Sequence, residues 1–371
     1  MVVKARVRVH KPRSRKPEVQ LCDQPVLLPH IVFSHLFRNK RALFASKFLG
    51  PNGGSSTLRQ FWNEVVRRRD PRIVRHPMCD RPNWQDYAIP ICVHGDAVPV
   101  VRVGRPGTKS LDCLSWQSLM AQGVTLGPKL LMTAVFEPNK LAGGEGLEGT
   151  METLWRVMAW SLNILFSGTF PEKDWQGEAW APGSSEAILC GTRLCSGEEP
   201  FFCVTWSIKG DLDWYAKSLH LRHYHSLEPC DYCECKKGAN TEMWPTNFQP
   251  SAPWKDTMRS GPAWRAASGH VHTLFREITY LSVLNLECDE LHILHLGVVQ
   301  WFLGSVLWLL VFVIKTGYPG QNMGEVWAAI LAAYEEFPNT VQMTSMGLSS
   351  FTDPKKPHAA FPKLGGSWMR D

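Results

Sequence analysis

Two aspartates follow a glycine at the end of an apolar segment. Asp96 ends the segment Ile89-Pro-Ile-Cys-Val-His-Gly-Asp, and Asp211 follows a second such segment that begins at Phe201. Val, Ile and aromatic residues favour strands, and glycine permits the tight turn that can end one. A carboxylate at such a strand end is well placed for chemistry. For a Gly-Asp pair taken alone, an aspartate that caps its own turn is the ordinary alternative.

A second pair of polar side chains lies close together later in the sequence. Asp289 and His292 stand three residues apart in Cys288-Asp-Glu-Leu-His. Residues at this spacing share one face of a helix, so the carboxylate and the imidazole would lie about one helical turn apart. Together these two groups suit a metal or a phosphate site.

A cysteine-rich segment offers a different kind of metal site. It contains Cys230, Cys233 and Cys235, preceded by His223 and His225. Two thiolates three residues apart can bind one Zn²⁺, and Cys235 or either histidine could complete the four ligands. A reduced loop without an ion is the alternative.

The cysteines also indicate the redox environment. The chain has 11 of them, unevenly spaced over 371 residues, which does not suggest a disulfide framework. Residues 1–20 carry seven basic side chains and no apolar segment of the kind that secretory signals contain. We therefore expect reduced thiols in an intracellular protein.

Positive charge is concentrated at the start of the chain. Residues 1–81 hold 18 Lys and Arg against 5 Asp and Glu, whereas the whole chain has a net charge of only +6. Up to residue 20, basic residues alternate with Val, Ser and Pro, so we expect a disordered arm that contacts phosphates or directs nuclear import. A tail that only increases solubility is the alternative reading of this charge.

The elements that must position these residues alternate between strands and helices. Residues 87–136 predict a three-strand meander with a hairpin turn over 104–110, where the spacing of glycine and lysine differs from that of a phosphate-binding loop. A helix is predicted over 151–166 and a further strand over 201–208. A chain of 371 residues has room for two or three domains, or for one large α/β domain with insertions.

The segment from Leu296 to Ile314 contains 19 residues without a charge. A membrane crossing needs about 20 apolar residues, so this segment could form a membrane anchor. Gln300, Gly304, Ser305 and the lack of a second such segment favour a buried helix that is covered on all sides.

Taken in order, these features resemble the catalytic core of cut-and-paste DNA transposases of the CACTA and related types. The similarity covers roughly residues 76–300 and depends on the ordered set of three motifs. It implies an α/β fold with an RNase H-like mixed sheet, helical insertions and a Cys-rich loop. The implied domains are a basic arm and helical region (1–81), a core (82–290) with an insertion at 137–200 and the Cys-rich loop at 223–235, and a helical C-terminal region (291–371). The three motifs that carry the resemblance are Ile89 to Asp96, Gly210-Asp211 with Cys230-Asp-Tyr-Cys233, and Cys288 to Val298.

The resemblance also implies a mechanism. Such enzymes use three acidic residues to hold two Mg²⁺ or Mn²⁺ ions, one of which activates the attacking water or 3′ hydroxyl while the other stabilises the leaving oxygen. Asp96 would be the first acid and Asp211 the second, with Asp213 a less favoured substitute. Asp289 and His292 match a D-x-x-H element that supports the site near the phosphate.

The third acid cannot be identified, because the late glutamates lie on what resembles an insertion helix. We therefore expect a truncated, degenerate transposase-like protein of the nucleus, with DNA as its partner, a homo-oligomer as a further assembly, and Zn²⁺ in the Cys-rich loop. One alternative is a DNA-binding module that has lost its catalysis. The other is a membrane protein with a single span over 296–314.

Overall fold

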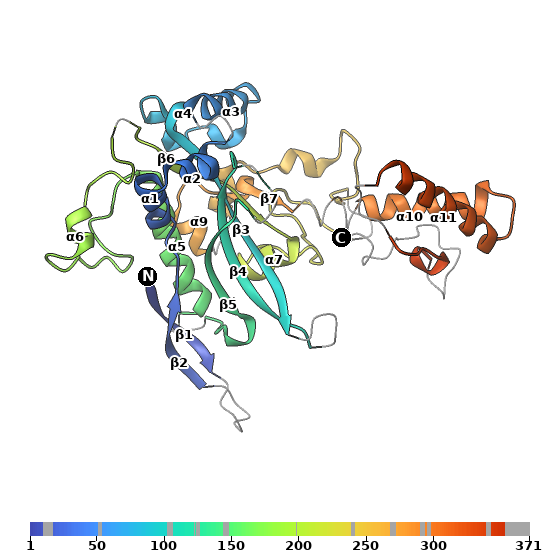
Figure 1. Cartoon of the computed structure of the whole chain (residues 1–371), viewed down its shortest axis with the longest axis horizontal. Coiled ribbons are helices and arrows are strands. Elements are labelled where there is room, and N and C mark those ends of the chain that lie inside the picture. Colours follow the sequence, from blue (N-terminus) through green and yellow to red (C-terminus); the bar gives the residue numbers. More distant parts are fainter. Residues whose placement is uncertain are drawn as a thin grey trace. The chain divides into compact units, whose positions relative to one another are not determined.

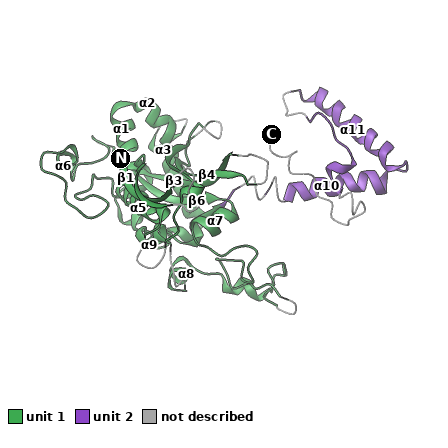
Figure 2. Ribbon diagram, turned by 90° about the horizontal axis from the view of Figure 1, so that it is seen from below, with its two compact units in different colours: residues 1–287 green, residues 288–371 purple. Residues whose placement is uncertain are grey.

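In a computed structural model, the chain divides into two units, Met1–Glu287 (unit 1) and Cys288–Asp371 (unit 2) (Figure 2). It describes residues 1–9, 18–50, 54–101, 107–121, 123, 127–143, 148–197, 199–238, 242–267, 272–289, 294, 298–338 and 343–352.

A five-stranded mixed sheet forms the centre of unit 1, with strand order β5-β4-β3-β6-β7 (Figure 1). Strands β3 (Ala88–Val101), β4 (Lys109–Ser118) and β5 (Leu130–Phe136) pair antiparallel, which confirms the predicted meander. Strand β6 (Phe202–Gly210) lies parallel to β3 on its other side, and β7 (Leu286–Cys288) lies next to β6. The α/β class with a mixed sheet is therefore confirmed.

Strand β3 differs from its prediction. The sequence predicted that the strand ends in a glycine turn at Gly95, but β3 continues through Asp96 to Val101 and keeps its antiparallel pairing with β4. The first half of β3 is buried, and the strand becomes exposed from Asp96 onward. Gly95 therefore has a packing role inside a strand, described below.

Helix α5 (Thr150–Ser167) is the longest helix of unit 1 and packs against β6, α1 and α9. Its apolar residues at spacings of three and four are almost completely buried, as the period of the predicted helix requires. Gly168 ends the helix with a φ of +78°, which favours glycine. The other helices of unit 1 are α1 (Pro29–Asn39), α2 (Arg41–Phe44), α3 (Ser55–Arg67), α4 (Trp84–Tyr87), α6 (Ser185–Leu189), α7 (Leu212–Ser218), α8 (Gly261–Ala267) and α9 (Thr273–Glu277).

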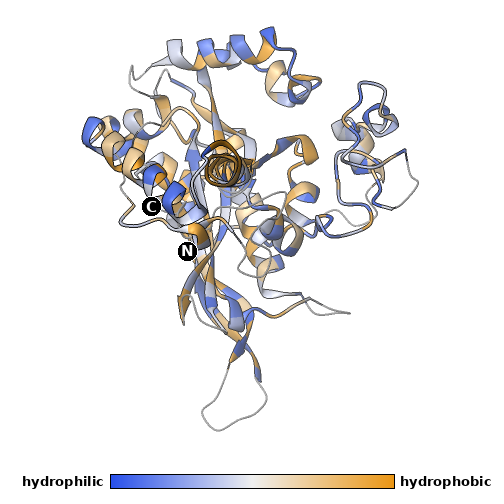
Figure 3. Cartoon of the chain, turned by 90° about the vertical axis from the view of Figure 1, so that its right-hand side faces the viewer, coloured by the Kyte–Doolittle hydropathy of each residue, from blue (hydrophilic) through white to orange (hydrophobic). Residues whose placement is uncertain are grey.

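The basic N-terminal segment forms a hairpin, so the prediction of a disordered arm is wrong for the residues that the structure describes there. Strand β1 (Val2–Val9) pairs antiparallel with β2 (Glu18–Pro25). Val3, Ala5 and Val7 are buried, while the basic residues between them point away from the core. This alternation is the period of a half-buried strand, and hydrophobic and hydrophilic colours mix along the hairpin near the N-terminus in Figure 3.

Unit 2 contains α10 (Gln300–Leu309), a π-helical turn (Leu310–Ile314) and α11 (Pro319–Glu336). Its core joins Leu307 and Val311 to residues of α11 and to Phe351. On the opposite side of the helix Phe302 is 63% exposed and Val313 60%, so the prediction of a helix covered on all sides is wrong for this part of unit 2. Among the described residues, no helix has the length and apolar character that a membrane crossing requires.

Candidate functional site

The pairing of β3 with β6 brings the two Gly-Asp motifs to the same edge of the sheet. In the parallel register, His94 of β3 lies opposite Lys209 of β6. This is the last pair of the register; Asp96 lies two residues further along β3, and Asp211 lies two residues further along the other segment, directly after β6. Neighbouring strands lie about 4.8 Å apart, so the two backbones approach closely at this point. Two segments that carry aspartates 115 positions apart in the chain are thus brought close together.

One tryptophan explains why a glycine precedes each aspartate. Trp214 of α7 lies against Gly95, where an added Cβ would fall 1.7 Å from its Cζ2 atom. The same ring lies against Gly210, where an added Cβ would fall 2.5 Å from Cε3. No side chain fits at either position without moving the ring. The glycines therefore allow Trp214 to cover both strands directly beside the two aspartates.

Trp214 is itself held by a buried carboxylate. Its indole Nε1 donates a hydrogen bond of 3.2 Å to Asp112 Oδ1 of β4, and Asp112 is 3% exposed. The other oxygen of Asp112 accepts from Lys140 Nζ at 2.9 Å. A buried carboxylate is expensive unless it is paired and hydrogen-bonded, and here both conditions are met. The sequence analysis missed Asp112, because one acidic residue within a predicted strand gives no signal of burial.

The face of the sheet that carries Asp96 is polar near the two aspartates. Side chains alternate along a strand, so Asp96 and His94 lie on the face opposite Gly95, and Lys209 shares their face through the register. Lys209 Nζ lies 3.6 Å from Glu287 Oε2 of β7, and Arg72 Nη1 lies 3.3 Å from Glu287 Oε1. Glu287 is an acidic residue of this face that the sequence analysis did not select.

Asp211 also has a structural role. Its side chain caps α7 by accepting a hydrogen bond of 2.5 Å from the backbone N–H of Trp214. This is the capping role that the sequence analysis gave as the alternative for a Gly-Asp pair. Asp213 makes contacts of its own, with Lys217 Nζ at 2.6 Å and His223 Nε2 at 3.5 Å. The hydrogen bond from Lys217 and the contact with His223 hold the pKa of Asp213 below its ordinary value.

The predicted D-x-x-H pair lies in unit 2 and is only partly described. Asp289 directly follows Cys288, the last residue of β7. Burial raises the pKa of the Cys288 thiol, and the charge of Asp289 raises it further. His292 lies outside the described residues, so its role as a ligand stays a prediction.

The Cys-rich loop contains the one metal-type cluster within the described residues. The Sγ atoms of Cys230, Cys233 and Cys235 all lie within 4.8 Å of one another, and Cys233 and Cys235 are buried. Tetrahedral Zn²⁺, with Zn–S distances of about 2.3 Å, places its sulfurs about 3.8 Å apart, so the three thiols fit a shared ion after a small contraction. This cluster could bind a metal ion such as zinc. It includes neither His223 nor His225, and His223 instead contacts Asp213.

Hydrogen bonds hold the Cys-rich loop in place. Arg222 Nη1 donates to the carbonyl of Cys230 at 3.1 Å, and its backbone N–H donates to Asp231 at 3.1 Å. Tyr232 donates its hydroxyl to the carbonyl of Leu286 at 3.0 Å, which ties the loop to the start of β7. Burial raises the pKa of the three thiols, so a metal ion must displace their protons when it binds.

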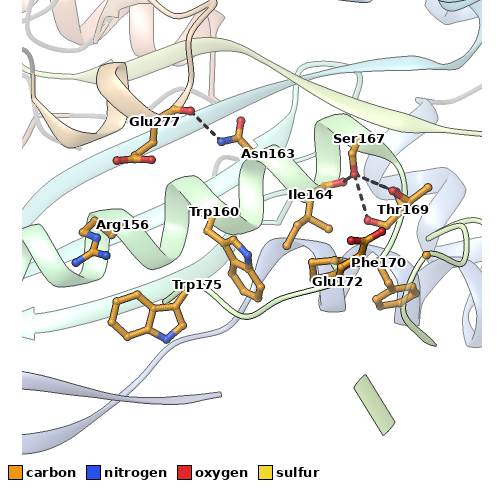
Figure 4. Close-up of a pocket in the computed structure, with 12 residues that line it drawn as sticks. Arg156, Trp160, Asn163, Ile164, Ser167, Thr169, Phe170, Glu172, Trp175 and Glu277 are labelled. Carbon is orange, nitrogen blue, oxygen red and sulfur yellow. Dashed lines mark hydrogen bonds between the residues drawn. The ribbon is translucent and has the colours of Figure 1, made fainter. Parts of the chain in front are cut away.

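A cavity of about 420 Å³ lies beside α5, and Figure 4 shows its lining. Trp160 and Trp175 lie on the same side of the helix in this view. On the other side Asn163 donates a hydrogen bond of 2.9 Å to the carbonyl of Glu277. None of the predicted site residues lines this cavity, so it is separate from the acidic site.

No family model matches the chain, and no curated protein or solved structure matches it either. The features of unit 1 that bear on function are two aspartates on neighbouring segments of the sheet and three thiols in a loop that is bonded to the same sheet.

Proposed function

We propose that unit 1 is an RNase H-like nucleic-acid-processing core of the cut-and-paste transposase type, in which Asp96 and Asp211 bind a divalent metal ion and phosphodiester bonds are cleaved or transferred. The observation that supports the proposal is the parallel register of β3 and β6, which pairs His94 with Lys209, two residues before Asp96 and Asp211 respectively. The core that the resemblance implies has four elements in order: a strand with the first acid, a meander, a helix and a strand with the second acid. Unit 1 has the same order of elements.

The ligands suit magnesium or manganese. Mg²⁺ prefers oxygen ligands, keeps several waters and is often held by one or two carboxylates together with substrate phosphates. Asp96 and Asp211 would supply such carboxylates, and Trp214 fixes the backbone next to each of them. Within the described residues, they belong to no closely spaced group of three ligands, which favours weak binding that the substrate completes.

A bound divalent ion would supply charge stabilisation and activation of the attacking oxygen. The chain's own residues would do the rest. Lys209 lies on the same face as Asp96 and can place a positive charge near a substrate phosphate, while Glu287 and Arg72 limit its freedom. The buried Asp112–Trp214 contact keeps the strand ends from moving apart.

The test is metal-dependent nicking of supercoiled DNA with Mg²⁺ or Mn²⁺. Asp96→Asn removes a ligand charge and keeps the side-chain shape, so nicking should fall at least about 100-fold, in the range that loss of one essential charge-stabilising group produces. Asp80→Asn is the matched control, because Asp80 is exposed and belongs to a different segment. Mn²⁺ binding, followed by electron paramagnetic resonance, should weaken for Asp96→Asn and stay unchanged for Asp80→Asn.

A DNA-binding module without catalysis is the second candidate, because no third carboxylate among the described residues joins Asp96 and Asp211 in a closely spaced group. It predicts that the wild-type chain and Asp96→Asn nick DNA equally poorly and bind it equally well. If Mn²⁺ binding is also the same for both proteins, the metal site itself is refuted.

We further propose that the Cys-rich loop binds Zn²⁺ through Cys230, Cys233 and Cys235. The ion would have a structural role, because the loop is anchored to β7 by Tyr232 and lies beside the end of β6 through the contact of His223 with Asp213. Zinc would then stabilise the region that follows the second aspartate.

A further inference from the structure

A large cavity of about 980 Å³ lies in unit 1 where β1, α5, α7, α8 and α9 approach one another. This volume lies at the upper end of the range of about 300–1,000 Å³ that ligand pockets cover. Seven basic or imidazole side chains line the cavity, against two acidic ones. The basic and imidazole residues are Arg8, Lys140, Lys217, His220, Arg265, His272 and Arg276, and the acidic ones are Glu137 and Glu152.

The five Lys and Arg come from five different segments of the chain. They belong to β1, the loop after β5, α7, α8 and α9. Three of them have acidic partners: Lys140 pairs with Asp112, Lys217 with Asp213 and Arg276 with Glu277. Arg8 and Arg265 form no ion pair with any described residue.

Arg265 is the more informative of these two cations. Its Nη1 donates hydrogen bonds to the carbonyls of Phe275 (2.5 Å) and Leu281 (2.8 Å), so the guanidinium is held in one position. Arg265 is partly buried, and this burial lowers the pKa of its guanidinium. A partly buried cation without an acidic partner is unfavourable unless an anion approaches it. A guanidinium with several donors in fixed positions suits a phosphate.

Two further features favour an anion in the cavity. The N-terminus of the 18-residue helix α5 faces it through Gly149 and Met151, and the positive end of a helix dipole attracts negative charge. His272 also lines the cavity, where burial, with smaller contributions from the nearby His220 and Arg276, lowers its pKa to about 3.

We propose that this cavity binds phosphate groups of a nucleic-acid backbone that crosses unit 1. The choice of nucleic acid rests on the proposed function, whereas the phosphate chemistry follows from the cavity. The backbone offers several phosphates in succession, which suits cations that arrive from several segments. Hydroxyls of Ser218 and Thr273 also line the cavity and can donate to phosphate oxygens.

The test compares DNA binding by two double variants with the same change in charge. Arg8→Gln with Arg276→Gln removes two cations of the cavity. Arg67→Gln with Arg68→Gln removes two exposed cations at the C-terminal end of α3, which pair with Glu64. Binding of a labelled single-stranded and a labelled duplex oligonucleotide is measured by fluorescence anisotropy from 50 to 200 mM salt without divalent metal. Circular dichroism checks that each variant is folded.

We expect the cavity variant to weaken DNA binding on the order of tenfold per lost phosphate contact at 0.1 M salt, and to lower the slope of log K against log salt by about 0.7–0.9 per contact. The α3 variant should stay within about twofold of the wild type. Equal losses in both variants would show that net charge alone attracts DNA, and would overturn the proposal.

Inorganic phosphate and pyrophosphate serve as separate probes. If either binds the wild type and not the cavity variant, while DNA binding is the same for both, the site takes a small phosphate and the nucleic-acid occupant is wrong. The nicking assay of Asp96→Asn is independent of these measurements. If DNA binding depends on the cavity but no nicking is detected, catalysis is refuted and the cavity proposal still holds.

Discussion

Gly95→Ala tests the packing that joins the two Gly-Asp motifs. The new Cβ would lie 1.7 Å from Cζ2 and 2.0 Å from Cε2 of Trp214. Carbon atoms in contact lie about 3.5–4.0 Å apart, so the indole ring must move by about 2 Å. Trp214 is only 4% exposed, so the ring cannot move into solvent without opening the core.

The expected loss of stability has two parts. Forcing one extra methyl into a packed core costs about 1–3 kcal/mol. Moving the ring also breaks the hydrogen bond from Trp214 to the buried Asp112, and an unsatisfied buried group costs about 1–3 kcal/mol more. The free energy of unfolding should therefore fall by about 2–6 kcal/mol, a large fraction of the stability of a typical domain.

Urea unfolding, followed by circular dichroism, measures this change. Repeating the substitution in a Trp214→Leu variant separates steric overlap with the ring from other effects. In Trp214→Leu the six-membered ring that occupies the space beside Gly95 is gone. Gly95→Ala should then change stability by less than about 1 kcal/mol, since alanine in a strand is at least as favourable as glycine. The coupling between the two changes should thus be several kcal/mol.

Gly324→Ala provides a matched control. Gly324 lies exposed in α11, and a Cβ there would meet nothing within 4 Å. The substitution should be neutral or stabilise by up to about 1 kcal/mol. If Gly95→Ala is as harmless as Gly324→Ala, or equally harmful in both Trp214 backgrounds, the packing argument is refuted.

Two further predictions concern pH and the cysteines. Burial lowers the pKa of His30 from 6.5 to about 3, so the folded chain keeps this ring neutral while the unfolded chain protonates it below pH 6.5. The contribution of His30 to stability should therefore be constant above that pH and fall by about 1.4 kcal/mol per pH unit between pH 6.5 and 3. His30→Gln should remove this part of the slope in urea titrations; an unchanged slope would contradict it. Cys233→Ser should abolish zinc retention and lower the melting temperature. Zinc is measured by its mercurial-triggered release to a chromogenic chelator. Cys79→Ser is the control, because Cys79 lies outside the cluster, and it should change neither property. Equal zinc contents in both variants would count against the cysteine site.

The sequence predicted the elements whose periodicity is strong. The meander over 87–136 and the helix over 151–166 were confirmed, because buried β-branched residues and apolar spacings of three and four are local signals. Predictions from local sequence patterns were wrong where one pattern has two possible structural causes. Gly95 was taken as the end of a strand, but the glycine is there to admit a ring from α7. The basic N-terminus was read as disordered, because its charge concealed the alternation of Val3, Ala5 and Val7.

By itself the sequence determined the residue types that carry chemistry: two aspartates after glycine, three cysteines within six positions and a basic first segment. Which of these meet was decided by the tertiary structure. The parallel pairing of β3 and β6 brings the segment before Asp96 next to the segment before Asp211, the fold of one loop gathers three thiols, and five distant segments converge on a cationic cavity. Pairing and convergence depend on burial between residues far apart in the chain, and no local pattern records such contacts.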